Sequence, residues 1–136
     1  MHKPFFHNVD LEIESCSSLE LFVKELGRKV VVLHSDWITN DLYLLSLEVT
    51  RSTKHADATI HALCSLVESL SPKAKQLWNR ATRKDFDIGY ENRSFPSRFT
   101  LRADTLKRIA KLGATLAVTC YEKDPNEFIC PNELDK

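Results

Sequence analysis

Two stretches near the end of the chain decide the fold: FDIGYE, Phe86–Glu91, and FTLRADTLKRIAKLGATLAVTCY, Phe99–Tyr121. In the first, apolar and charged residues alternate, which is typical of a strand with one face in water. The second begins as a loop and continues as an amphipathic helix over Ala103–Leu112, with Gly113 as its stop. Ala114–Tyr121 then has the composition of a last strand. A strand, a helix and a strand in this order predict layers of helix and sheet.

The first half of the chain repeats these signals. Val9–Ile13 alternates apolar residues with acids, and an amphipathic helix that ends at Gly27 follows it. Apolar runs at Val30–Leu33 and Leu42–Val49 predict two strands. The segment Ser35–Asp41 between them is rich in turn-forming residues, so we expect the two strands to form a hairpin.

Two helices are predicted in the middle of the chain. The first runs from about His55 to Leu70, and the second begins at Ser71, because serine suits the N-cap and Pro72 the first turn. In the later helix at 103–112 we expect Leu106, Ile109 and Ala110 to face inward. The whole order is strand, helix, strand, strand, helix pair, strand, helix, strand.

The first six of these elements match a split βαβ, or ferredoxin-like, arrangement, to which one helix and one strand are added. We therefore predict a single α+β domain over residues 1–123, with a mainly antiparallel sheet and helices packed on one face. Residues 124–136 have the polar composition of a C-terminal tail.

Composition agrees with one soluble domain. The 136 residues are 43% hydrophobic and 28% charged, which is ordinary for a globular protein. No apolar run is long enough to span a membrane, and the first residues lack the apolar core of a signal peptide, so we expect a cytoplasmic protein. The four cysteines are widely spaced and are interpreted as reduced thiols.

The C-terminal half resembles a known group of proteins. HALCSLVESLSPKAKQLW (61–78), FDIGYE (86–91) and LRADTLKRIAKLGATLAVTCY (101–121) are similar to a small bacterial domain family of unknown function, about 130 residues long. In that family an apolar helix ends in a break like Leu-x-Pro, and a Leu-rich helix ends in a Leu-Gly turn. The resemblance implies the fold and a bacterial origin, and it supplies no catalytic residue.

Two pairs of residues have spacings seen in catalytic or metal sites. Asp57 and His61 are four apart and share a helix face, whereas His55 points elsewhere and leaves the set without a third ligand. His34 and Asp36 would lie on one side of a strand. No nucleophile motif accompanies either pair, and three glycines in the chain make a phosphate-binding loop improbable. We predict no enzyme activity, no metal and no cofactor.

Charge is unevenly distributed although the net charge is zero. Residues 73–111 hold eleven Lys or Arg against four acids. Aromatic residues accompany this charge near Tyr90, Phe95 and Phe99, as in proteins that bind single-stranded RNA. Nucleic-acid binding is therefore the alternative function, with these candidate contacts: Arg93, Arg98, Lys107 and Arg108.

Acids on two predicted strands suggest a different partner. Because the apolar residues of these strands must face the core, the acids between them are expected on the open face of the sheet. They are Asp10, Glu12, Glu14, Asp85, Asp87 and Glu91. Small cytoplasmic bacterial proteins of this size and layout are often immunity proteins, which neutralise a cognate toxin by direct binding. The sequence thus favours a protein partner, a positively charged toxin, contacted by these carboxylates.

Overall fold

The computed structural model describes residues 5–51, 53–92 and 98–122. The first half of the chain forms these elements: strand β1 (Phe5–Ser15), helix α1 (Glu20–Leu26), the 3-10 turn η1 (Gly27–Lys29), strand β2 (Val30–Thr39) and strand β3 (Leu42–Val49). The second half forms helix α2 (Ala56–Glu68), helix α3 (Pro72–Arg80), strand β4 (Arg83–Asn92), helix α4 (Ala103–Lys111) and strand β5 (Thr115–Glu122). The predicted tail, residues 124–136, lies outside the described residues.

The strands form one sheet in the order β2-β3-β1-β4-β5. β1 lies antiparallel between β3 and β4, and β2 is antiparallel to β3. The first four strands therefore have the order of a split βαβ unit, as predicted. β5 is added at the far edge, parallel to β4, and α4 makes the crossover that a parallel pair requires.

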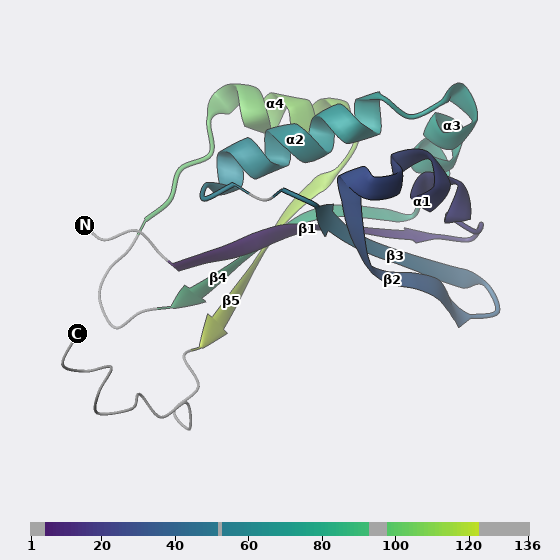
Figure 1. Ribbon diagram of the computed structural model, residues 1–136, viewed down its shortest axis with the longest axis horizontal. Coiled ribbons are helices and arrows are strands. Elements are labelled where there is room, and N and C mark those ends of the chain that lie inside the picture. Colours follow the sequence, from purple (N-terminus) through teal and green to yellow (C-terminus); the bar gives the residue numbers. More distant parts are fainter. Residues whose placement is uncertain (1–4, 52, 93–97, 123–136) are drawn as a thin grey trace.

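All four helices lie on one side of this open sheet, and α2 and α4 run side by side over its centre (Figure 1). The core fills the space between the two layers. Alternate residues of the strands enter it, together with the inner faces of α1, α2, α3 and α4. Its largest fully buried side chains include Tyr43, Phe22, Phe86, Leu11 and Ile13. The predicted α+β fold, with helices on one face of a mainly antiparallel sheet, is confirmed.

Local chemistry explains where several elements begin and end. Ser71 is the N-cap of α3, because its hydroxyl accepts a hydrogen bond from the N–H of Ala74 at 3.2 Å. Gly27 and Gly113 follow α1 and α4 with φ of 52° and 69°, a conformation in which a side chain would be strained. These predicted boundaries are confirmed.

Two local predictions are wrong. The segment Ser35–Asp41 was expected to be a turn, but β2 continues through Thr39 and the turn is confined to residues 40 and 41. Pairing with β3 outweighs the local turn preference of these residues. On α4, Ile109 is buried as predicted, but Leu106 and Ala110 are exposed and Thr105 is the other buried residue. Within the described residues, no helix has the length and apolar character needed to cross a bilayer.

Candidate functional site

The sheet face opposite the helices carries a band of carboxylates, which we call the acidic face: Asp10, Glu12, Glu14, Glu48, Asp85, Asp87 and Glu91. On β1 these acids alternate with Val9, Leu11 and Ile13, which are fully or almost fully buried under the helices. Successive side chains of a strand point to opposite faces, so burial of the apolar set directs the acids to the open side.

Strand pairing brings these acids into rows across the sheet. Asp10 lies directly opposite Asp87, and Glu12 lies opposite Asp85. Acids directly opposite each other on neighbouring strands repel, and this repulsion destabilises a sheet unless a cation separates them. Most of the carboxylates are half-buried, because side chains on adjacent strands shield one another. The structure therefore collects the predicted residues Asp10, Glu12, Glu14, Asp85 and Asp87 on one surface.

Arg83 offsets part of the negative charge at one end of the acidic face. Its guanidinium donates to Glu14 Oε1 at 3.0 Å and to a carboxylate oxygen of Asp85, and it lies 3.5 Å from Glu12 Oε2. The hydrogen bond to Glu14 is the largest cause of a raised pKa at Arg83, so the cation is firmly held. One arginine thus serves three carboxylates, which leaves this end locally anionic.

The other end, around Asp10, has no such cation among the residues described. Burial raises the pKa of Asp10 to about 6, and repulsion from Glu48, Asp87 and Glu12 adds to the effect. Both carboxylate oxygens of Asp87 accept from the Thr119 hydroxyl, at 2.8 and 2.9 Å. Ionised Asp10 therefore costs free energy in the folded protein, because its surroundings favour the protonated carboxyl group.

Glu48 belongs to the acidic face but was not predicted. Its strand had the composition of an apolar run, yet Glu48 lies between the buried residues Leu47 and Val49 and so points to the open side. Its carboxylate accepts a hydrogen bond from Asn8 Nδ2 at 2.5 Å. In the described part of the chain, the other side-chain atom of Asn8, Oδ1, is buried without a hydrogen-bond partner. Alternation within Leu42–Val49 was the signal that would have found Glu48.

Glu91 lies at the end of β4, two residues beyond Gly89 on the same side of the strand. It pairs with Phe5 on β1 and with Tyr121 on β5. It is therefore on the predicted face but away from the rows that surround Asp10.

The residues predicted to contact nucleic acid do not act alike. Arg93 lies outside the described residues. Arg98 borders a hollow of about 360 Å³ that is also lined by Tyr90 and Phe99, whose rings meet edge to face at 5.8 Å. Lys107 is exposed on α4, whereas Arg108 is half-buried and bonded to other side chains.

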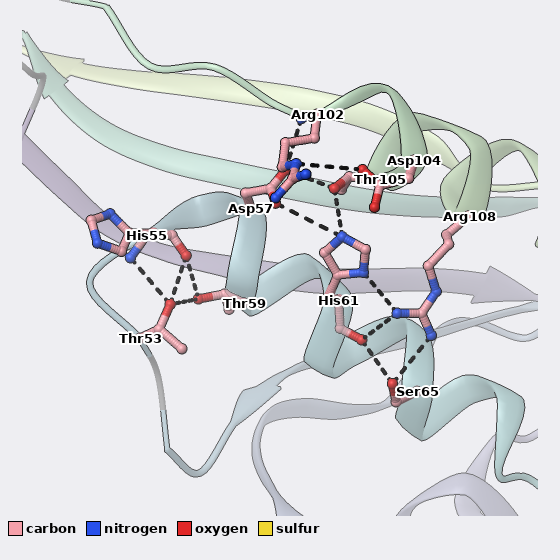
Figure 2. A network of polar contacts seen from close by, with 10 residues as sticks. All are labelled: Thr53, His55, Asp57, Thr59, His61, Ser65, Arg102, Asp104, Thr105 and Arg108. Carbon is pink, nitrogen blue, oxygen red and sulfur yellow. Dashed lines mark hydrogen bonds and ion pairs between the residues drawn. The ribbon is translucent and has the colours of Figure 1, made fainter.

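Asp57 and His61 form a polar network between α2 and α4 (Figure 2). The Asp57 carboxylate accepts from the N–H of Arg102 at 2.9 Å and from the hydroxyl of Thr105 at 2.7 Å. The same hydroxyl lies 2.7 Å from His61 Nε2. Asp57 thereby accepts from the backbone N–H of Arg102, the N-cap residue of α4. The Arg102 side chain itself makes no capping hydrogen bond. The two helices are fixed to each other by these contacts.

Arg108 closes the network from α4. Its guanidinium lies 2.8 Å from His61 Nδ1 and 2.5 Å from Glu68 Oε1, and it also contacts Ser65 Oγ at 3.1 Å. The ring of His55 points away from this network (Figure 2), and its carbonyl accepts from Thr53 and Thr59 instead. Asp57 Oδ1 and both ring nitrogens of His61 thus join α2 to α4, which is a structural arrangement.

His34 and Asp36 lie on one side of β2, as predicted, opposite Ser46 and Leu44 of β3. Both side chains are exposed, and the Asp36 carboxylate accepts from the N–H of Trp37 at 2.7 Å. In the part of the chain that the structure describes, no three His, Cys, Asp or Glu side chains are arranged to hold a metal ion.

Comparisons of this chain with protein-family models, curated proteins and solved structures give no match. The resemblance to a bacterial domain family therefore stays a prediction, and the function is inferred from the site alone.

Proposed function

We propose that this chain is a partner-binding protein that uses its acidic face to bind a positively charged protein. The observation that carries the proposal is the row in which Asp10 lies opposite Asp87 with Glu48 close to it, without a neutralising cation among the described residues. A fold that keeps like charges adjacent loses stability in the free state. A cationic partner would recover that free energy on binding.

The geometry of the face suits a protein surface. Strands are spaced about 4.8 Å apart, so the carboxylates of neighbouring strands form rows that several Lys or Arg side chains can contact together. Such a field also accelerates association, since opposite potentials steer the two proteins into contact.

The particular partner that we propose is a bacterial toxin, which makes this chain an immunity protein. The support is the small α+β domain, the separation of acidic and basic regions, and the resemblance of 61–78, 86–91 and 101–121 to a bacterial domain family. An immunity protein requires fast and selective association, which a concentrated acidic face favours.

Nucleic-acid binding is the weaker candidate. Arg108 already bonds to His61 and Glu68, so a phosphate would have to displace those contacts. Phosphates would also be repelled by the acidic face.

The product of the neighbouring reading frame, expressed with and without this chain, tests the proposal. We expect that product to slow growth when expressed alone, and co-expression of this chain to restore growth. The two purified proteins should then form a complex whose affinity falls with rising salt. A neighbouring product that is harmless, or whose toxicity persists on co-expression, would contradict the immunity function.

A pair of matched variants locates the binding surface. Asp10→Lys with Asp87→Asn changes the charge of the acidic face by three units, and the amide at 87 retains an acceptor for Thr119. Glu20→Lys with Asp104→Asn makes the same change at exposed positions on the helix side. We expect at least about a tenfold loss of affinity for the first variant and less than about a twofold loss for the control. Equal effects of the two variants would exclude the acidic face.

A further inference from the structure

Strand β2 exposes an unusual number of large apolar side chains. Val31, Val32, Leu33, Trp37 and Ile38 are between 37% and 52% exposed, although all belong to one strand. Single exposed apolar residues are normal on a protein surface, but a contiguous group indicates an interaction site. The proposed role of the acidic face does not explain why these apolar side chains are exposed, because only some of the β2 residues lie on that side of the sheet.

β2 is also an edge of the sheet. Among the described residues it pairs with β3 on one side and with no strand on the other (Figure 1). An edge strand presents unpaired backbone N–H and C=O groups, which another strand can satisfy. The register with β3 shifts next to Leu33 and next to Ile38, and His34–Trp37 pairs regularly between these shifts. This regular stretch is the centre of the edge to which a further strand can be added.

The sequence of β2 is complementary to itself around Ser35. If two copies pair antiparallel with Ser35 at the two-fold axis, each His34 lies opposite Asp36 of the other copy. Leu33 then lies opposite Trp37, and Val32 lies opposite Ile38. Within Val32–Ile38 every apolar residue meets an apolar residue and no charge meets a like charge, whereas Val31 lies opposite Thr39. These opposed pairs favour association.

The sides of the sheet to which His34, Ser35 and Asp36 point agree with this register. His34 and Asp36 pair with Ser46 and Leu44 of β3, so both lie on the same side of β2. Two residues that face each other across paired strands must point to the same side of the sheet, and His34 and Asp36 of the two copies meet this condition. Ser35 is half-buried and its hydroxyl is 2.5 Å from the Tyr43 hydroxyl, so it points to the helix side in both copies. The two-fold axis is then perpendicular to the sheet.

From this self-complementarity we propose that the chain forms a symmetric homodimer in which two β2 strands pair antiparallel. The two sheets become one continuous sheet, with both helix layers on one side of it. The acidic faces of the two copies share the other side, so the dimer presents two equivalent partner-binding surfaces in one plane. This proposal stands on β2 alone and does not require that the acidic face binds a protein.

A charge exchange across the two-fold axis tests both the dimer and its register. His34→Asp places a carboxylate opposite Asp36 twice in each dimer, and we expect the dissociation constant to rise by about tenfold or more. Asp36→His places two imidazoles opposite each other and should not strengthen the dimer. Combining His34→Asp with Asp36→His restores an acid opposite an imidazole, and the dissociation constant should return to within about threefold of the original.

Sedimentation equilibrium of the purified full chain, over a range of concentrations, measures these constants. Asp41→His is the matched control for Asp36→His, because it makes the same substitution at an exposed position in the turn beyond β2. Urea unfolding of each variant shows that it remains folded. A chain that is monomeric at concentrations up to about 100 µM would overturn the proposal. So would a dimer that His34→Asp leaves unchanged, or a double variant that stays as weak as His34→Asp.

Discussion

Replacing Asp10 by asparagine should stabilise the protein at neutral pH, although the substitution removes a charge and adds nothing. Asp10 faces Asp87 directly, and its pKa is raised from 3.8 to about 6, mainly by burial and then by the nearby carboxylates. Asparagine has almost the same shape and carries no charge. The variant therefore removes the repulsion and the cost of burying an ionised carboxylate while it keeps the packing.

The pKa shift sets the size and the pH range of the effect. Two pKa units correspond to about 3 kcal/mol, which we reduce to about 1–2 kcal/mol because Asp10 is only half-buried. The folded state binds the proton more tightly than the unfolded state, so the penalty is absent below pH 3.8 and complete above about pH 6. Asp10→Asn should thus gain about 1–2 kcal/mol at pH 7.5 and roughly a third of that at pH 4.5.

Urea unfolding followed by circular dichroism at the two pH values measures this difference. Asp41→Asn, at an exposed position in the hairpin turn, is the control and should change the free energy of unfolding by less than about 0.5 kcal/mol at both pH values. A gain that is equal at pH 4.5 and 7.5, or a loss of stability at pH 7.5, would refute the reasoning about Asp10.

Three further substitutions test the contacts that hold the helices in place, each by the free energy of unfolding in urea. Thr105→Val leaves Asp57 and His61 without their shared hydroxyl in a fully buried position, and should cost about 1–3 kcal/mol, whereas Thr105→Ser should cost less. Ser71→Ala removes the N-cap of α3 and should cost about 1 kcal/mol. Gly113→Ala should cost about 1–2 kcal/mol, because Gly113 has a φ of 69° that strains a residue with a side chain. If one of these substitutions leaves the free energy of unfolding unchanged, the interaction or backbone conformation that it tests does not stabilise the fold.

Much of the fold could be predicted because one-sided burial leaves a clear period in the sequence. The alternation at Val9–Ile13 and Phe86–Glu91 and the helical spacing in α2 each specified an element and its buried side. The order of the first four strands was inferred instead from the match of the element order to a split βαβ unit, because contacts between distant segments leave no period in the sequence. The position of the acids on one face followed from alternation alone, but their pairing across strands needed the register.

Other features escaped prediction because tertiary contacts outweighed local preference. Residues Ser35–Thr39 have turn-forming composition, yet pairing with β3 extends the strand through them. Thr105 is buried because Asp57 and His61 satisfy its hydroxyl, and neither partner is near it in the sequence. Glu48 was overlooked because one acid in an apolar strand gives little signal. Its neighbours on β1 make it part of the site.

Proton release on binding is the measurement that bears on the acidic face itself. A cationic partner seated on this face would lower the pKa of Asp10, which is about half-protonated at pH 6 in the free protein. Titration calorimetry of the complex at pH 6, repeated in buffers of different ionisation enthalpy, counts the protons exchanged. We predict release of about half a proton per complex, and its loss in Asp10→Asn. Binding of the partner with no proton release, and with the same affinity in Asp10→Asn, would contradict the role proposed for the acidic face.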